Sequence, residues 1–298
     1  MSGSRRKLSA TRCASFFFAT IAFVFIAAVF TLFIWQSIPV WRHCGTGYFT
    51  GTKWFYRTQV FGALPMIYGS AIVSIIAIGL AAPVALGAAI FTSEYLPRGL
   101  RTAVKIIIEL LAAIPSVVYG LLGILFLREW VYSGFARFNL LSGDTLLTAG
   151  ILLAVMILPT VTTLSDDALR AVSGTQRAAA RALGLTQTET ILSVSLPGAG
   201  PGIAAALLLG IGRALGETIA VFLVVGRQDN QWPANLLSMR PWLEAGQTLT
   251  SKLGGSETNI AYGDPLHWAA MVGLGLILLA TVSGITFVGS RLAQRNHA

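Results

Sequence analysis

The stretch that decides the fold runs from Ala178 to Pro197 and reads Ala-Ala-Ala-Arg-Ala-Leu-Gly-Leu-Thr-Gln-Thr-Glu-Thr-Ile-Leu-Ser-Val-Ser-Leu-Pro. It is polar, although long apolar runs lie on both sides. Gly184 supplies the left-handed residue that ends a first short helix. Thr186 and Glu189 have the spacing of a capping box that starts a second helix, which Pro197 is expected to close. The stretch therefore predicts a water-exposed helix-turn-helix that another protein can bind.

This stretch resembles the "EAA" loop of ABC-importer permeases, in which alanines precede a glycine and an aliphatic-x-Leu-Pro sequence follows it. In that family the loop docks into a groove on a separate ATPase subunit. The resemblance implies that the ATPase-coupling residues are Ala178, Ala179, Ala180, Gly184, Leu196 and Pro197. The family's leading Glu is Ala178 here, so a salt bridge made by that Glu cannot form. We expect the helix-glycine-helix geometry to remain.

The composition places the chain in a membrane. Of its 298 residues, 55% are apolar and only 11% are charged, and the mean hydropathy is +0.72. These values lie far outside the range of soluble globular domains. The net charge of +9 comes from bases scattered singly between apolar runs. A nucleic-acid interface gathers its bases on one face, so the pattern argues against a nucleic-acid partner.

No metal site or directly bound cofactor is expected. Cys13 and Cys44 lie on opposite sides of the first apolar run and cannot pair with each other, and there is no CxxC motif. His43, His267 and His297 are isolated near span ends or termini. We expect these histidines to be solvated loop residues.

The first apolar run extends without a charge from Ala14 to Ile38, after a basic segment. At about 1.5 Å per residue, this run crosses a hydrocarbon core of ~30 Å. It is too long for the apolar region of a signal peptide, and no convincing small-x-small cleavage site follows it. We therefore expect an uncleaved first membrane helix.

Five further apolar runs bring the number of predicted membrane helices to six: about Ile67 to Phe91, Val104 to Leu127, Leu146 to Leu164, Pro201 to Val225, and Trp268 to Val288. The predicted organisation has three parts. Residues 1–66 hold the N-terminal segment, the first membrane helix and the first outer loop. Residues 67–290 form the permease core with a coupling loop at 165–200, and residues 291–298 form a tail.

The distribution of bases orients these helices. Lys and Arg outside the predicted spans are more numerous on the side of the two termini and of the Gly184 loop. The positive-inside rule therefore predicts that both termini and this loop are cytoplasmic. The opposite loops, Pro39 to Met66 and Gly226 to His267, are rich in Trp and Tyr. Two interpretations stay open for these aromatic residues: an interfacial belt, or a docking surface for an external partner.

Three prolines, Pro83, Pro115 and Pro159, fall inside the predicted spans. A proline in a membrane helix frees a carbonyl group and bends the axis. Bending is tolerated where neighbouring helices or a cavity satisfy the freed group. The prolines indicate helices that line a cavity.

Apart from Lys105, which is counted with the bases at the edge of the third span, three charged residues lie inside predicted spans: Arg213 and Glu217 in the fifth, and Glu109 in the third. A charge at mid-membrane costs roughly 2.5 to 3.5 kcal/mol on insertion scales, so such residues are usually functional. Arg213 and Glu217 are four residues apart and are expected to share a helix face. One interpretation is a self-neutralising ion pair. Because an apolar pair is cheaper to bury, we favour a substrate pathway that contains all three residues.

Arg213 is the first choice for a substrate contact, because a planar guanidinium gives bidentate bonds to a tetrahedral oxyanion. A nearby carboxylate repels fully ionised sulfate but accepts a hydrogen bond from protonated phosphate. We therefore hypothesise that Glu217 selects phosphate over sulfate, or alternatively that it holds Arg213 between turnovers. Glu109 lies nearer the cytoplasmic end of its span, so both a snorkelling or packing role and a substrate role stay open.

Three motifs sharpen the prediction: Gly62-Ala-Leu-Pro-Met-Ile-Tyr-Gly69, Glu109-Leu-Leu-Ala-Ala-Ile-Pro-Ser-Val-Val-Tyr-Gly120 and Gly212-Arg-Ala-Leu-Gly-Glu-Thr218. They resemble the permease subunits of the Pst phosphate ABC importer, most closely the PstC type. The resemblance implies an all-α, six-helix membrane protein with the type I (MetI-like) permease fold, located in the inner membrane. It also implies a sister permease of the PstA type, two ATP-binding subunits of the PstB type and a periplasmic phosphate-binding protein of the PstS type. Inorganic phosphate would then enter the cell by alternating access.

Interpretations from other classes stay open. The chain has no Walker motif, so it is not expected to hydrolyse ATP; ATP is used by the partner subunit. A secondary transporter or channel could use Arg213 and Glu217 without any ATPase. An enzyme acting on phospholipid is disfavoured, because no His/Asp cluster gathers at a span end. Within the importer interpretation, the alternative substrates are other oxyanions such as sulfate or molybdate.

Overall fold

The computed structural model describes residues 2–138, 140–233 and 239–294. Within these residues, six helices are long and apolar enough to cross a membrane: Ser15–Cys44, Leu64–Tyr95, Ser116–Gly134, Leu146–Ala171, Gln187–Gly216 and Pro265–Ala293. The prediction of an all-α protein with six membrane helices is confirmed. Residues 295–298 of the predicted tail, which include His297, lie outside the described residues.

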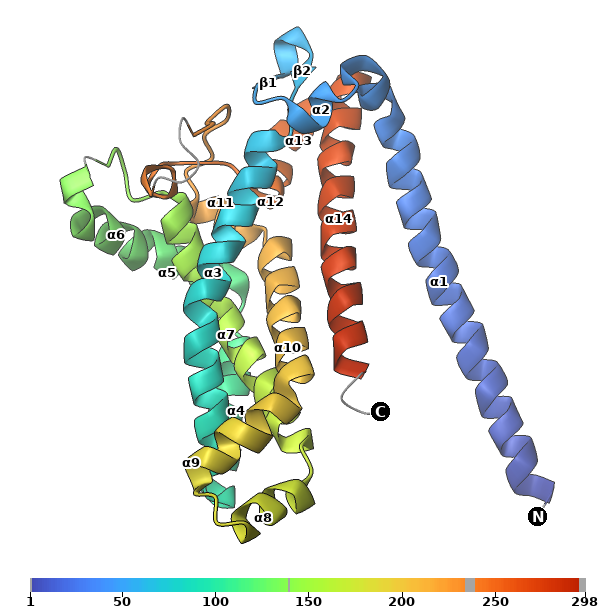
Figure 1. Ribbon diagram of the computed structural model, residues 1–298. Coiled ribbons are helices and arrows are strands. Elements are labelled where there is room, and N and C mark those ends of the chain that lie inside the picture. Colours follow the sequence, from blue (N-terminus) through green and yellow to red (C-terminus); the bar gives the residue numbers. More distant parts are fainter. Residues whose placement is uncertain (1, 139, 234–238, 295–298) are drawn as a thin grey trace.

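The long helices run lengthwise through the molecule, and the first of them diverges from the others toward the N-terminus (Figure 1). Short elements lie at both ends and, with α5 and α6, at one side of the bundle. We call the end that carries α8 the coupling-loop end and the end that carries β1 and β2 the sheet end. The chain begins at the coupling-loop end, and the last described turn of α14 points toward the same end. The long elements are α1 (Ser2–Cys44), α3 (Leu64–Ile90), α7 (Leu146–Ala171), α10 (Leu196–Gly216) and α14 (Pro265–Gln294).

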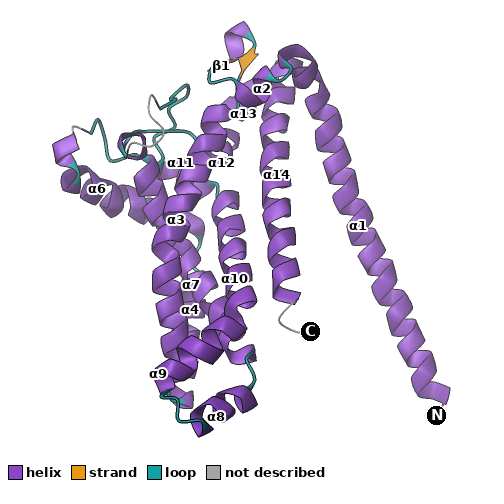
Figure 2. Ribbon diagram, viewed as in Figure 1, coloured by secondary structure: helices purple, strands orange, loops and turns teal. Residues whose placement is uncertain are grey.

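Short elements connect these helices, and almost all of them are helical (Figure 2). The exception is one antiparallel pair, β1 (Trp54–Phe55) and β2 (Val60–Phe61), in which Trp54 lies opposite Phe61. The other short elements are α2 (Gly47–Thr50), α4 (Arg98–Ala112), α5 (Ser116–Leu122), α6 (Arg128–Gly134), α8 (Gly174–Ala182), α9 (Gln187–Thr190), α11 (Ile219–Val224), α12 (Leu249–Leu253) and α13 (Glu257–Ala261). Single 3-10 or π turns complete the chain: η1 (Tyr56–Thr58), η2 (Phe91–Tyr95), η3 (Gly123–Leu127), η4 (Ala136–Phe138), η5 (Ile191–Ser195) and η6 (Arg240–Leu243).

Small side chains allow α3, α7 and α10 to pack closely around the main core. Ala77 and Ala149 are fully buried there. A β-carbon at Gly150 of α7 would lie 2.5 Å from Ile76 Cγ2 of α3, so only glycine permits this approach. Membrane helices gain little from hydrophobic association and rely on such close contact instead. The packing fixes α7 against both of its neighbours.

The third span begins at Ser116 and not near Val104, and this corrects the sequence-based boundary. The preceding residues form a separate amphipathic helix, α4, and Pro115 lies between α4 and α5 with extended backbone angles. Proline disfavours a helical conformation for the residue before it, so the helix cannot continue through Ile114. Glu109 therefore lies in α4, outside the third span. Pro83 and Pro159 do lie inside helices, as predicted.

The fifth span also differs from its predicted limits. Pro197 does not close the second helix of the coupling loop, because Gln187–Gly216 forms one continuous helix. In the π turn η5 of this helix, the N–H of Leu196 donates to the carbonyl of Ile191. The hydrogen-bond register of the helix is therefore already shifted at Pro197, which has no N–H to donate. The helix then ends at Gly216, well before Val225, and α11 follows as a separate short helix.

A buried polar cluster fastens the loops at the sheet end. Lys252 is only 2% exposed and forms ion pairs with Asp229 at 2.7 Å and with Glu257. The Glu257 carboxylate also accepts a hydrogen bond from Trp54 Nε1 at 2.6 Å and lies 2.9 Å from His267 Nε2. His267 is therefore buried, and the prediction that it is a solvated loop residue was wrong. The contact with the Glu257 carboxylate offsets the free-energy cost of burying the His267 imidazole.

This cluster predicts an acid-sensitive contribution to stability. Burial acts to raise the pKa of Glu257, but its contacts with Lys252, Trp54 and His267 outweigh burial and hold the pKa below the usual value. A lowered folded-state pKa adds stability above the unfolded-state pKa, and this stability disappears as pH falls through the folded-state value. Glu257→Gln should destabilise the protein by about 2 kcal/mol at pH 7 and by progressively less as the pH falls through the folded-state pKa of Glu257. Thermal unfolding in detergent across an acidic pH series measures this, and a loss that stays the same throughout the series would contradict the assignment.

Candidate functional site

Arg213 lies on α10 with its side chain exposed, and its position is fixed by a neighbouring helix. Its Nη1 donates a hydrogen bond to Thr160 Oγ1 of α7 at 2.9 Å. Thr160 directly follows Pro159, in the half of α7 that packs against α10. A neutral hydroxyl orients the guanidinium without neutralising its charge. Arg213 thus keeps the charge that an anionic ligand requires.

Glu217 does not share a helix face with Arg213, and this corrects the expected geometry. The backbone of Glu217 is extended, with φ −74° and ψ 121°, because α10 ends at Gly216. Its Oε1 accepts a hydrogen bond from the N–H of Ala220 at 3.5 Å, in the first turn of α11. A carboxylate at this position satisfies an unpaired helix N–H group. Although both residues are described, no ion pair joins Arg213 and Glu217, so the self-neutralising pair does not form in this structure.

Glu109 is exposed near the end of α4, where its own carbonyl accepts a hydrogen bond from the N–H of Ala113 at 3.1 Å. Tyr119, in the motif that begins with Glu109, lies in the third span, and its hydroxyl donates a hydrogen bond to the carbonyl of Leu111 of α4 at 2.9 Å. Tyr119 belongs to one of the three family motifs, but it was not predicted as a site residue. Thr160 carried no sequence signal, since it is one of several hydroxyl residues in α7.

Apolar surface surrounds these polar groups. α5 and α11 pack together where Gly120 meets Ala220 and Leu223, and both helices leave large side chains uncovered. Leu121 is 50% exposed and Ile219 is 48% exposed. A guanidinium facing lipid at this depth would be costly.

The coupling loop has the local geometry that the sequence predicts. Gly184 has φ +90°, and the N–H of Leu185 donates to the carbonyl of Ala180 at 3.3 Å, so the turn closes α8. The N–H of Thr186 donates to Glu189 Oε2 at 2.8 Å, which completes the predicted capping box. Both predictions are confirmed. The coupling role of the loop stays a prediction.

The surface of α8 is suited to contact another protein. Ala178 and Ala179 are exposed, Ala180 is buried, and Leu183 is 83% exposed. α8 forms the tip of the coupling-loop end, with the short helix α9 beside it (Figure 1). A small apolar patch at such a tip is typical of a surface that inserts into a groove. Leu196 and Pro197 lie within the continuous helix that follows, not in a loop.

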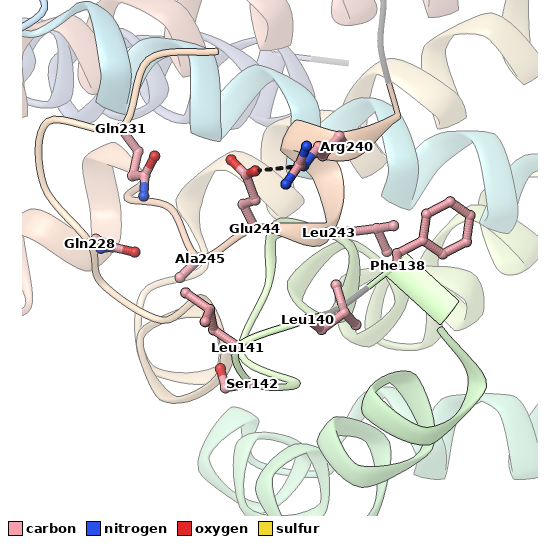
Figure 3. A pocket seen from close by; sticks show the side chains of 10 residues that line it. All are labelled: Phe138, Leu140, Leu141, Ser142, Gln228, Gln231, Arg240, Leu243, Glu244 and Ala245. Carbon is pink, nitrogen blue, oxygen red and sulfur yellow. Dashed lines mark ion pairs between the residues drawn. The ribbon is translucent and has the colours of Figure 1, made fainter. Parts of the chain in front are cut away.

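A pocket of about 420 Å³ is lined by residues other than the predicted site residues (Figure 3). One of its walls carries the ion pair between Arg240 and Glu244, at 3.6 Å. The lining consists of Phe138, Leu140, Leu141, Ser142, Gln228, Gln231, Arg240, Leu243, Glu244 and Ala245. Neither Arg213 nor Glu217 lines this pocket, so its size alone does not identify the transport site.

Residues 81–296 match the family model of the "Binding-protein-dependent transport system inner membrane component". The chain belongs to this family. Curated relatives of this permease include "Phosphate transport system permease protein PstC" of Mesorhizobium japonicum, 35% identical over 87% of this chain and 80% of the relative. "Phosphate transport system permease protein PstC 1" of Mycobacterium tuberculosis is 34% identical over 85% and 84% of the two chains. The Pasteurella multocida PstC permease is 32% identical over 94% and 89%.

The permease also resembles a solved structure with a remote sequence. A chain of the MetNI methionine ABC transporter in inward-facing conformations superposes with a TM-score of 0.57 and 16% sequence identity. The match covers 77% of this permease and 93% of the MetNI chain. At this identity the similarity concerns the fold alone. It confirms the predicted MetI-like architecture.

Proposed function

We propose that this permease is the membrane subunit of an ATP-driven importer that carries inorganic phosphate into the cell. The observation that carries the proposal is Arg213, a membrane-helix guanidinium that the neutral Thr160 hydroxyl orients at 2.9 Å. The relatives whose sequences align with most of this chain are named for phosphate transport. An arginine of this kind is suited to a tetrahedral oxyanion.

The separation of Glu217 from the helix of Arg213 supports phosphate selection. The carboxylate and the guanidinium belong to different backbone segments, so they need not neutralise each other. Phosphate that keeps a proton can donate that proton to a carboxylate, whereas sulfate has none to donate at neutral pH. One carboxylate and one guanidinium together would then prefer protonated phosphate.

The arrangement of the two ends supports coupling to ATP. The tip at α8, with Ala178 to Ala180, Gly184 and the part of the following helix that contains Leu196 and Pro197, is the surface on which an ATP-binding subunit would act. A sister permease would cover the exposed apolar side near Arg213, and a substrate-binding protein would deliver phosphate at the sheet end. Both termini and α8 would then be cytoplasmic. ATP-driven movement of α8 would switch the access of the Arg213 site between the two sides of the cytoplasmic membrane.

Uptake in phosphate-starved cells tests this proposal. Labelled phosphate and, separately, labelled sulfate are supplied with the permease present, absent and restored. We expect loss of phosphate uptake alone on deletion, with recovery on restoration. Loss of sulfate uptake instead would keep the importer and overturn the substrate. Uptake that persists when every candidate ATPase is deleted would favour a secondary transporter or channel.

Glu217→Gln should reduce the preference for phosphate over sulfate by about tenfold, which corresponds to ~1.4 kcal/mol and lies near the lower end of the ~1.5–3 kcal/mol that one hydrogen bond to a charged group contributes. The amide keeps the size of the side chain but removes its negative charge, so repulsion of sulfate disappears. Competition of unlabelled sulfate against labelled phosphate uptake measures the preference. The matched control is Glu129→Gln on exposed α6. An unchanged preference in Glu217→Gln would exclude the selection role.

Thr160→Val should raise the KM for phosphate about threefold to tenfold, because it removes one hydrogen bond worth about 0.5–1.5 kcal/mol from Arg213. Thr160→Ser keeps the hydroxyl and should restore the normal KM. Thr163→Val is the matched control, since the Thr163 hydroxyl bonds to the carbonyl of Pro159 in its own helix at 3.0 Å. Equal effects of Thr160→Val and Thr163→Val would mean that the bond to Arg213 has no role in substrate binding.

A further inference from the structure

A buried ion pair joins the coupling loop to the second membrane span. Arg177 of α8 approaches Glu94 with its Nη2 3.3 Å from Oε1. The Glu94 side chain is only 4% exposed and the Arg177 side chain 19%. Glu94 lies in the π turn η2, which extends α3 at the coupling-loop end. Two segments far apart in the sequence thus meet through opposite buried charges.

Glu94 contacts both helices of the helix-turn-helix. Its side chain pairs with Arg177 of α8, and its backbone carbonyl accepts a hydrogen bond from Gln187 Nε2 of α9 at 2.8 Å. Arg177 also donates to the carbonyl of Leu169 near the end of α7. One residue at the end of the second span therefore holds the two helices that flank Gly184.

The turn that carries Glu94 is itself held in place. Arg101 of α4 donates hydrogen bonds to the carbonyls of Thr92 at 2.7 Å, Ser93 at 2.6 Å and Leu96 at 3.1 Å. These carbonyls lie at the end of a helix, where the backbone has no further N–H partners and where a cation is favourable. Movement of α8 would therefore act on an ordered end of the second span and not on a loose turn.

Stability alone does not account for a buried ion pair at this position. Replacing such a pair by apolar side chains of similar volume is often neutral or stabilising, whereas removing one partner is costly. We propose that Glu94 is the positioning residue of the coupling loop: through Arg177 it makes α8 and the second span move as one body. This inference rests on the proposed function, because it assumes that an ATP-binding subunit moves α8.

The test uses the double variant Glu94→Leu/Arg177→Met in the complete transporter, reconstituted in liposomes with its ATP-binding and substrate-binding subunits. We expect the amount of phosphate imported per ATP hydrolysed to fall at least fivefold. The matched control, Lys105→Met/Asp167→Leu, removes an exposed ion pair of 3.1 Å at the same end of the bundle and should leave the ratio within twofold of wild type. A merely structural role would lower import and hydrolysis together, so an unchanged ratio in the Glu94/Arg177 variant would overturn the proposal.

Two further variants distinguish loss of the contact between the two charges from a folding defect. Glu94→Gln keeps the shape of the side chain and should lower the ratio in a complex that contains the normal amount of ATP-binding subunit. The reversed pair Glu94→Arg/Arg177→Glu should recover more of the ratio than either single reversal. If the reversed pair gave no more import per ATP than the single reversals, the contact between the two charges would not be the cause.

A distance measurement separates this inference from the proposed substrate. Spin labels at the exposed positions Val84 of α3 and Arg181 of α8, in a chain without its native cysteines, report the separation of the two helices. We expect the same narrow distance distribution with and without ATP, and a distribution that shifts or broadens with ATP in the double variant. A wild-type distance that changes with ATP as much as in the variant would overturn the proposal. Wild-type liposomes that import no phosphate would instead overturn the proposed function.

Discussion

Arg213→Ala should lower the initial rate of phosphate uptake about a hundredfold or more at a subsaturating concentration. The substitution removes a bidentate, charge-assisted contact, and each such hydrogen bond is worth about 1.5–3 kcal/mol. Two of them correspond to at least two powers of ten in affinity. Labelled phosphate uptake in phosphate-starved cells, normalised to the amount of permease in the membrane, measures the effect.

Two control variants identify the cause of this loss. Arg213→Lys keeps the charge but loses the planar fork, so about a tenfold reduction is expected. Arg227→Ala removes a different arginine, which follows α11 and whose guanidinium lies 4.4 Å from the centre of the Phe222 ring in that helix, and should change uptake less than twofold. Normal uptake by Arg213→Ala would remove Arg213 from the transport pathway.

Gly184→Val should reduce phosphate uptake at least tenfold while the permease stays in the membrane at its normal level. Nothing lies within 4 Å of a β-carbon placed at Gly184, so a steric clash with other residues is not the reason. The φ angle of +90° is the reason, because a β-branched residue held there is strained by about 1–3 kcal/mol. The turn between α8 and α9 would open, and ATP hydrolysis would continue without import. Parallel assays of uptake and of ATP hydrolysis by the reconstituted transporter measure the uncoupling.

Gly174→Val is the matched control for this prediction. Gly174 begins α8, has open space around its β-carbon position and has no positive φ, so valine should be tolerated there. Gly184→Asn should recover part of the uptake, since asparagine enters the left-handed region more readily than valine. Equal uptake by Gly184→Val and Gly174→Val would refute the assignment of the coupling turn.

Features that depend on neighbours along the chain could be predicted from the sequence. The six spans follow from uninterrupted apolar runs, because the hydrophobic effect and the need to satisfy backbone groups in lipid act on each segment separately. The left-handed Gly184 and the Thr186–Glu189 capping box involve bonds across three to five residues. Arg213 and Glu217 also indicate a candidate site, because charged residues inside an apolar run are costly wherever the run is placed in the bundle.

The breaks within the apolar runs were harder to predict, because apolar composition looks the same on both sides of a break. Pro115 separates α4 from the third span, and Gly216 ends α10 before Glu217. Pro197, a residue that ends most helices, lies inside a continuous one because η5 shifts the hydrogen-bond register ahead of it. The predicted third and fifth spans ran through Pro115 and Gly216, and a helix was expected to end at Pro197, so the predictions were wrong at all three positions.

By itself, then, the sequence determined the membrane class, the number of spans and the shape of the coupling turn, since all of these arise from local hydrophobicity and short-range hydrogen bonds. Only the tertiary structure decided which polar side chains meet. Thr160 orients Arg213 from another helix, Glu257 pairs with the buried His267, and Glu94 holds Arg177. The buried groups among them, such as His267 and Glu94, are stable in the interior only beside their partners, and packing alone brings together helices that lie far apart in the chain.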